Sequence, residues 1–259
     1  MPATGNAVLR RLSVMTPILA VIFDVDGVLV DSPHEKAWRE ALAGLTDPAR
    51  LTPAFYQAYV AGKPRDDGAR SALQHLGLPS DTREVQAYAE AKQSLLLAMI
   101  KARDFTVFPD ALAFLQALRA RGFKVAAASS SMNAGRMLQL IPLGPDRTLG
   151  EMFDANLCGQ VLQHGKPDPE IYLNAAKALG IDPVQCLVVE DAAVGIVAGR
   201  AGGMRTLGLA RRGDDDLLLA VPADLVVQNL SEVAVDALVE GRLERKAGKP
   251  DHAPRAGAE

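Results

Sequence analysis

Hydrophobic residues along the chain fall into short apolar runs that alternate with segments of helical spacing. The run from Ile18 to Phe23 is uninterrupted, rich in β-branched residues and too short for a typical helix, so it predicts a strand buried on both faces. Further strands are expected at 123–128, 153–158, 186–189, 204–209 and 224–227. Helices are expected at 111–121, through Met137, at 170–179, at 195–203 and from Ser231 onward. This alternation predicts an α/β protein with a doubly wound parallel sheet.

One part of the chain has helical spacing without any strand signal. Apolar residues recur at helical intervals in 34–45, 51–60, 67–76 and 81–100, and Gly62, Gly77 and Pro79 separate these segments. We therefore expect a small α-helical cap domain, residues 33–104, inserted after the first strand. The catalytic core would comprise 17–32 and 105–240, preceded by a leader at 1–16 and followed by a disordered tail at 241–259.

Composition narrows the classes of protein that the chain can be. Its 259 residues, 49% of them hydrophobic, suffice for one sizeable core and a smaller attached domain. A formal net charge of −3 gives no electrostatic case for binding nucleic acid or a membrane. Arg10 and Arg11 before the first apolar run could mimic a secretory signal, but that run is short and ends in acids. We expect a cytoplasmic protein, and a monomer.

Two carboxylates follow the first strand directly. Asp24 and Asp26 stand at its carboxyl end, where open parallel sheets bind ligands, and Gly27 frees the backbone just after them. Two carboxylates so close repel each other unless a cation lies between them or one of them takes up a proton. The pair therefore suggests a metal-bound carboxylate beside a proton-transferring one. The alternative is a pair of solvated turn residues, which is common for Asp near Gly.

Three further loops carry polar groups that a doubly wound sheet would bring to the same edge. Ser129 to Ser131 follow a predicted strand, Lys166 precedes a predicted helix, and Glu190 and Asp191 end another strand. Carboxylates for a divalent cation, hydroxyl and amide donors and one ammonium group together favour phosphoryl transfer. Taken singly, each has a structural alternative: the serines could cap a helix, the lysine could be a solvated surface residue, and the acids could face a helix dipole.

A nucleotide-binding site is disfavoured. The segment 159–166 resembles a P-loop, but it has one residue too many between its glycines and Pro167 where Ser or Thr is required. No GxGxxG motif follows a strand. Asp214 to Asp216 could suggest a metal site, but we expect an acidic loop there.

The motifs in this order resemble the haloacid dehalogenase-like phosphotransferases, specifically the β-phosphoglucomutase-like group with a helical cap. The resemblance covers roughly residues 18–230. It depends on DVDGVLVDS at Asp24 to Ser32, the Ser129 loop, GKPDPEIY at Gly165 to Tyr172 and VVEDAAVGI at Val188 to Ile196. The chain departs from the family pattern in a longer loop at 141–150 and in two fewer residues after Ser32.

The resemblance implies a role for each core residue. Asp24 would be the nucleophile that forms an aspartyl phosphate, and Asp26 the general acid and base. Mg²⁺ would be held by Asp24, by the main-chain carbonyl of Asp26 and by Asp191, with Glu190 at a position that also contacts the metal. Ser129, the amide of Ser130 and Lys166 would hold the transferring phosphate. A carboxylate can act as the nucleophile when a metal and a lysine offset the repulsion between two anions.

The cap residues bear on the substrate. The stretch from Val60 to Gly68 resembles the substrate-specificity loop of the mutases, and Arg65 matches the arginine that binds the non-transferring phosphate. Four other residues match polar or aromatic positions of the same site: His34, Trp38, Lys92 and Asn133. A guanidinium fork suits phosphate. By contrast, we expect Trp38 to belong to the cap core, and His34 could be a surface helix residue.

Three functions stay open at this point. The first is a Mg²⁺-dependent β-phosphoglucomutase that converts β-glucose 1-phosphate to glucose 6-phosphate through a bisphosphate. The second is a sugar-phosphate phosphatase on the same scaffold. The third is a non-catalytic module that binds a phosphorylated ligand. In each case the expected partner is a small phosphorylated molecule.

Overall fold

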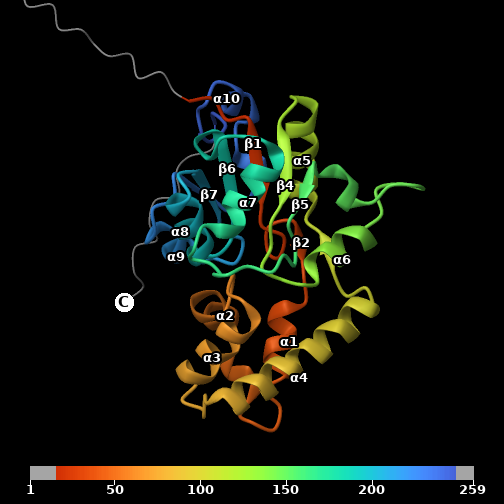
Figure 1. Cartoon of the computed structure of the whole chain (residues 1–259), viewed down its shortest axis with the longest axis vertical. Coiled ribbons are helices and arrows are strands. Elements are labelled where there is room, and N and C mark those ends of the chain that lie inside the picture. The colour runs from red at the N-terminus through yellow and green to blue at the C-terminus, as the bar shows by residue number, and fades with distance from the viewer. Residues whose placement is uncertain (1–15, 249–259) are drawn as a thin grey trace, which may run out of the picture.

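The fold is a six-stranded parallel sheet with helices on both faces and a separate group of helices beside its carboxyl edge (Figure 1). The computed structural model describes residues 16–248. Its strands are β1 (Ala20–Phe23), β2 (Val30–Asp31), β3 (Thr106–Val107), β4 (Lys124–Ala127), β5 (Ala155–Asn156), β6 (Cys186–Glu190), β7 (Arg205–Leu209) and β8 (Leu225–Val227). Its α-helices are α1 (His34–Glu40), α2 (Pro53–Tyr59), α3 (Arg65–His75), α4 (Thr82–Lys101), α5 (Pro109–Ala120), α6 (Ala134–Leu140), α7 (Glu170–Leu179), α8 (Ala193–Ala201), α9 (Asp215–Leu219) and α10 (Val235–Val239). The predicted fold class is confirmed.

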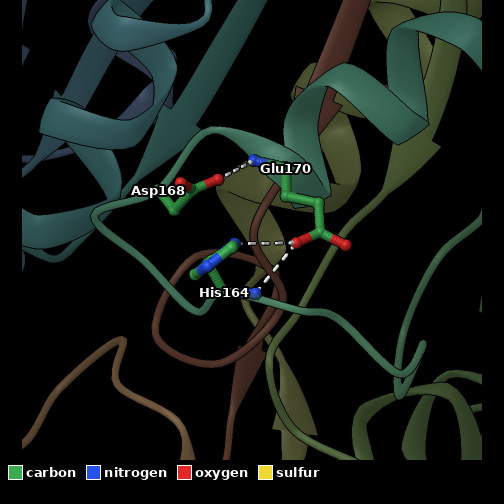
Figure 2. A group of neighbouring side chains, drawn as sticks. All are labelled: His164, Asp168 and Glu170. Atoms are coloured by element: carbon green, nitrogen blue, oxygen red, sulfur yellow. Dashed lines mark hydrogen bonds and ion pairs between the residues drawn. The ribbon is translucent and has the colours of Figure 1, made fainter.

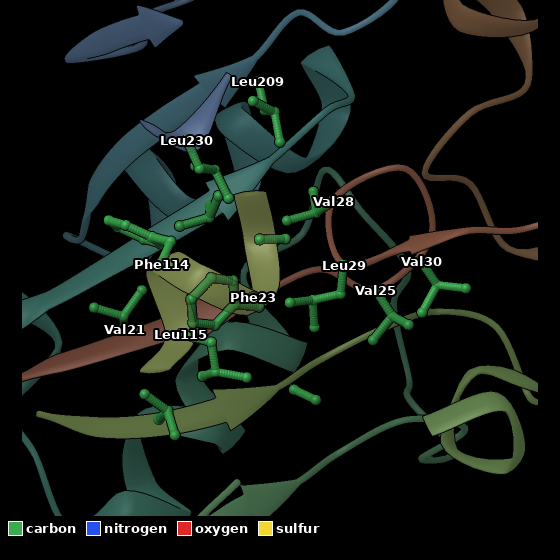
Figure 3. Packing of buried hydrophobic residues seen from close by; sticks show 14 of the residues in the cluster. Val21, Phe23, Val25, Val28, Leu29, Val30, Phe114, Leu115, Leu209 and Leu230 are labelled. Carbon is green, nitrogen blue, oxygen red and sulfur yellow. The ribbon is translucent and has the colours of Figure 1, made fainter. Parts of the chain in front are cut away.

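The sheet has the strand order β5-β4-β1-β6-β7-β8, with β1 near its middle. Every residue of β1 is fully buried, as its uninterrupted apolar run predicts. Its alternate side chains face opposite layers. Val21 and Phe23 pack with α5, where Phe23 meets Phe114 edge-on at a ring-centroid distance of 6.1 Å (Figure 3). Ala20 and Ile22 belong to the cluster on the other face, together with residues of α7 and α8.

Helices α1 to α4 have a small core of their own. Trp38, Leu42, Leu73 and Tyr88 are buried in a cluster that contains no residue of the sheet. Helix α4 begins where Asp81 accepts hydrogen bonds from the first free amides of the helix, those of residues 83 and 84. In Figure 1 these four helices lie below the carboxyl edge of the sheet. We call them the cap.

Two short strands connect the cap to the core. β2 and β3 pair antiparallel, so the chain leaves the core and returns to it along one two-stranded ribbon. No sequence pattern predicted this ribbon, because each strand has only two residues. No helix within residues 16–248 combines the length and apolarity needed to cross a bilayer.

Some predicted boundaries are wrong. The strand expected at 153–158 is reduced to Ala155–Asn156, at the sheet edge. The helix expected from Ser231 is a 3-10 turn, Leu230–Glu232, followed by α10. The tail expected to be disordered from 241 pairs with the core as far as Lys246, whose amide donates to the carbonyl of Glu232 at 2.7 Å. Residues 249–259, and the predicted leader except for Thr16, lie outside the described residues.

Candidate active site

The register of the sheet brings the predicted loops to one edge. Phe23 lies opposite both Ala127 and Val189, so the residues that follow these three strand positions leave the sheet side by side. Asp24, Ser129 and Glu190 are among them. Side-chain contacts described below join them to Lys166, which comes from the loop before α7. The predicted convergence is therefore present, whereas the catalytic roles stay predictions.

Lys166 is the centre of the site. Its side chain is fully buried, and its Nζ donates to Asp24 Oδ1 at 2.6 Å and to Glu190 Oε1 at 2.5 Å. Burial opposes the charged form, but the two carboxylates outweigh it and hold the pKa of Lys166 well above its ordinary value. An ammonium group is thus fixed beside the predicted nucleophile, where an incoming phosphate would need it.

Glu190 supports this lysine. Its Oε1 also accepts from the hydroxyl of Tyr172 at 2.7 Å, and its Oε2 accepts from the amide of Ala192 at 2.9 Å. A Cβ at Gly195 would lie 1.8 Å from Oε1, so only glycine lets α8 pack this closely on the carboxylate. Both oxygens therefore have protein partners, and Oε1 holds Lys166 in place. The contact with a metal that the resemblance implies for Glu190 stays a prediction. Tyr172 was missed, although it stands within the GKPDPEIY motif.

Asp24 and Asp191 form the part of the site that suits a cation. Burial, reinforced by Glu190 and Asp26 and opposed by Lys166, raises the pKa of Asp24 to about 7. Burial, Glu190 and Asp24 raise the pKa of Asp191 well above its ordinary value. A Cβ at Gly27 would lie 1.9 Å from Asp191 Oδ2, so the chain keeps this carboxylate close by having glycine there. Without a cation nearby, these buried carboxylates resist ionisation. They suit Mg²⁺, which prefers oxygen ligands.

Asp26 has one carboxylate oxygen held and the other available. Ser129 Oγ donates to Asp26 Oδ2 at 3.2 Å and accepts from the amide of Ser131 at 3.1 Å. Within the described part of the chain no hydrogen bond reaches the buried Asp26 Oδ1, and His34 Nε2 lies 3.5 Å from it. The hydroxyl of Ser130 is likewise buried and unpaired among residues 16–248. An available carboxylate oxygen is what a general acid and base requires.

His34 and Lys92 connect Asp26 to the cap. Lys92 Nζ lies 3.0 Å from His34 Nδ1 and 4.8 Å from the ring centroid of Trp38. An ammonium can only donate, so neutral His34 accepts at Nδ1 and carries its proton on Nε2. That Nε2 donates to Ser131 Oγ at 3.2 Å and lies 3.5 Å from Asp26 Oδ1. Burial lowers the pKa of His34 to about 4, with Asp26 opposing and Lys92 adding to the effect. Burial also lowers the pKa of Lys92 to about 8.

A cavity of about 320 Å³ lies between cap and core and is lined by residues of both. The predicted site residues that line it are Asp24, Asp26, His34, Trp38, Arg65, Lys92, Ser129, Ser130, Asn133 and Asp191. Arg65 is half exposed, and its Nε lies 3.3 Å from Asp66 Oδ1. Asn133 exchanges hydrogen bonds of 3.3 and 3.4 Å with Gln93 of α4, so core and cap meet there too. Lys166 and Glu190 do not line the cavity; Lys166 contacts Asp24, which does, and Glu190 contacts Lys166.

One expectation about acidic residues is wrong. Asp214 to Asp216 were expected to form an acidic loop, but Asp215 and Asp216 begin α9, and Asp214 just before it is only 9% exposed. Its Oδ2 accepts from Gln57 Nε2 of the cap at 3.0 Å. The same Nε2 lies 3.4 Å from Asp191 Oδ2. Neither Gln57 nor Asp214 belongs to a motif, so the sequence offered no sign of this contact.

A second group of ionisable side chains, His164, Asp168 and Glu170, flanks Lys166 in the sequence, on the loop before α7 and at the first residue of that helix (Figure 2). Glu170 Oε2 accepts from the amides of His164 and Gln163, each at 2.9 Å. Asp168 Oδ1 accepts from the amide of Glu170 at 2.9 Å. These carboxylates are occupied with backbone amides at the start of α7, so the group shapes the loop that presents Lys166.

Comparisons with known proteins agree with this geometry. A family model described as haloacid dehalogenase-like hydrolase matches residues 18–203. A β-phosphoglucomutase of Mycobacterium bovis is 33% identical over 86% of this chain and 94% of its own length. Hexitol phosphatase A of Escherichia coli is 30% identical over 83% of this chain and 92% of its own length. The crystal structure of an archaeal β-phosphoglucomutase from Pyrococcus sp. strain ST 04 has a TM-score of 0.67 and 33% identity, over 85% of this chain and 96% of that one.

Proposed function

We propose a function from one premise: the chain belongs to the haloacid dehalogenase-like hydrolase family, in its β-phosphoglucomutase-like group. On that premise we propose a phosphotransferase that acts on a sugar phosphate through an aspartyl phosphate on Asp24. The contact of buried Lys166 with Asp24 at 2.6 Å is the observation that supports it best. It places a fixed positive charge where the repulsion between a carboxylate nucleophile and a phosphate would otherwise be largest.

The proposed reaction has two half-steps. A carboxylate oxygen of Asp24 forms a bond to phosphorus while the bond between phosphorus and the sugar oxygen breaks, and Asp26 gives its proton to the leaving oxygen. In the second half-step a hydroxyl of the sugar attacks phosphorus, the bond between phosphorus and the Asp24 oxygen breaks to release the carboxylate, and Asp26 takes the hydroxyl proton. The available Oδ1 of Asp26 suits this exchange. Ser129, the Ser130 amide and Lys166 would hold the phosphoryl oxygens.

The residues present also fit a divalent cation. Asp24, Asp191 and the main-chain carbonyl of Asp26 would hold Mg²⁺. When bound, the ion would offset the negative charge of the phosphoryl oxygens. In its absence, the two buried carboxylates have raised pKa values, Asp24 at about 7 and Asp191 well above its ordinary value.

For the substrate we propose β-glucose 1-phosphate, converted to glucose 6-phosphate. A mutase must bind one phosphate while it acts at the other end of the sugar, and then bind the reversed molecule. Arg65 lines the cavity on the cap side, opposite the core groups, and could bind the second phosphate. His34, Lys92 and Asn133 line the same space and would contact the sugar or its phosphate.

The test is to incubate the protein with β-glucose 1-phosphate, Mg²⁺ and a catalytic amount of β-glucose 1,6-bisphosphate. We expect glucose 6-phosphate to appear. Arg65→Ala should lower its formation about tenfold to 100-fold, as loss of a charge-assisted phosphate contact would. Arg70→Ala is the matched control, because Arg70 is an exposed arginine of the same helix whose Nη1 donates to the carbonyl of Ser80. Inorganic phosphate without any 6-phosphate would reject the mutase.

A sugar-phosphate phosphatase is the second candidate. It is favoured by the contact of Arg65 Nε with Asp66 Oδ1 at 3.3 Å, which competes with a second phosphate for that guanidinium. A phosphatase needs only the core groups and a water molecule that attacks the aspartyl phosphate. Phosphate release unaffected by Arg65→Ala would support it. A non-catalytic module would require that the parent protein and Asp24→Asn be equally inert.

A further inference from the structure

The loop 210–214, which follows β7, is fixed to the core by one side chain. Arg211 donates through Nη1 to Asp110 Oδ2 at 2.9 Å. Its Nε and Nη2 donate to the carbonyls of Gly27 and Val28, each at 3.2 Å. Its guanidinium also lies 4.1 Å from the ring centroid of Phe108. Arg211 thus holds the loop against the turn Asp24–Val28 of the proposed active site, through an ion pair, two hydrogen bonds to carbonyls and a cation–π contact.

The same loop reaches the cap at two places. Arg212 Nη1 donates to Glu35 Oε2 of α1 at 2.5 Å, and both side chains are largely buried. Two residues further on, Asp214 accepts from Gln57 of α2 at 3.0 Å. The Arg212 amide holds the other oxygen of Asp214 at 3.2 Å. One short core segment therefore contacts two different cap helices.

One of these contacts lies next to a residue that lines the cavity. Gln57 Nε2 also approaches Asp191, a carboxylate of the proposed cation site, at 3.4 Å. Close packing seals the same boundary elsewhere: a Cβ at Gly62 of the cap would lie 2.9 Å from that of Ala192. Removal of the cap from the core would break both polar contacts and open the cavity to water.

We propose that the loop 210–214 is the core half of a clasp that holds the cap closed, with Glu35 and Gln57 as the cap half. This inference depends on the proposed function, because it concerns what reaches the aspartyl phosphate. Water can attack that intermediate only if it enters the cavity, whereas the bound sugar is already inside it. Arg212 and Gln57 are thus positioning residues that set the ratio of transfer to hydrolysis without touching the substrate.

The experiment compares two arginines that share one partner. Arg212→Met removes the contact of Glu35 with the core. Arg39→Met is the matched control, because Arg39 Nη1 donates to the other oxygen of Glu35, at 2.7 Å, from within the same cap helix. With the glucose phosphate assay above, we expect Arg212→Met to raise the amount of inorganic phosphate released per 6-phosphate formed roughly threefold to tenfold, as loss of a largely buried ion pair would. The Arg39→Met ratio should equal that of the parent.

Further variants separate the clasp from a general loss of stability. Gln57→Leu should shift the product ratio in the same direction, and Glu35→Gln should add little to Arg212→Met, because the two changes break one contact. High salt should move the parent toward the Arg212→Met ratio. An unchanged ratio in both Arg212→Met and Gln57→Leu would overturn the clasp, as would an equal effect of Arg39→Met.

Cap position provides a readout that does not depend on the reaction. Small-angle scattering of the full chain should give a larger radius of gyration for Arg212→Met and Gln57→Leu than for the parent and Arg39→Met. If the parent turns over no sugar phosphate, the proposed function fails, but this expansion would still support the clasp. Active protein with identical scattering and identical product ratios in all variants would reject the clasp alone.

Discussion

Replacement of Lys166 by methionine tests the electrostatic centre of the site. Methionine keeps most of the side-chain volume and removes the charge that Asp24 and Glu190 share at 2.6 and 2.5 Å. Loss of one partner from a buried ion pair costs about 3–5 kcal/mol of unfolding free energy, because the remaining charge is left without compensation. The variant should therefore be much less stable than the parent, in contrast to the small effect of removing a surface lysine.

The loss should grow with pH. The raised pKa of Lys166 means that its stabilising charge is present throughout the neutral range and is lost only as pH rises through that raised value. Asp24, with a pKa of about 7 in the parent, is protonated below pH 7 in both proteins. Above pH 7, Asp24 ionises beside Lys166 in the parent. In the variant Asp24 must keep its proton, because no ammonium group offsets its charge. That difference costs the variant about 1.4 kcal/mol per pH unit.

The assay is urea unfolding of metal-free protein at about pH 6 and about pH 8.5, where the linkage predicts losses of about 3 and about 5 kcal/mol. Lys177→Met is the matched control, since Lys177 is an exposed lysine of α7 and should change stability by less than about 0.5 kcal/mol. A loss under about 1 kcal/mol, or one that is the same at both pH values, would refute the reasoning. Turnover by Lys166→Met should also fall at least about 100-fold.

Three other changes test single groups of the site. Asp24→Asn should abolish turnover and leave the fold intact by circular dichroism; activity within about tenfold of the parent would contradict a nucleophilic role. Lys92 has a pKa lowered to about 8 by burial, so kcat/KM should fall as pH rises through about 8 and its donation to His34 loses charge. The Lys92→Met variant should lack this decline in kcat/KM, and an unaltered pH profile would contradict the role of Lys92. Burial of the charged ammonium costs the parent stability at every pH below the ordinary lysine pKa, so Lys92→Met should unfold at a higher urea concentration than the parent near pH 7. Tyr172→Phe removes only the hydroxyl that Glu190 accepts, so unfolding free energy should fall by about 1–2 kcal/mol, and an unchanged urea midpoint would show that the contact is not needed.

Hydrophobic patterns predicted the longer strands and helices well, because each such pattern lies within the element that it predicts. The apolar run 18–23 fits a strand buried on both faces, and it became the fully buried β1. The helical spacing of 81–100 likewise became α4, within one residue at each end. Where the sequence failed, the elements were short: two-residue strands such as β2 and β5 have too few positions for a period to appear.

The sequence by itself determined which groups come to the carboxyl edge of the sheet. Parallel strands that lie side by side bring the residues after Phe23, Ala127 and Val189 together, independently of the conformation of the loops. It could not determine how those groups pair. Only the tertiary structure turned Glu190 toward Lys166 and Tyr172, and only it buried Asp214 against Gln57. The physical reason is separation along the chain: the partners of the Gln57–Asp214 and Glu35–Arg212 contacts stand 157 and 177 residues apart. When the partner of a polar side chain is this distant in the sequence, the residues around that side chain show only the pattern of an ordinary surface position.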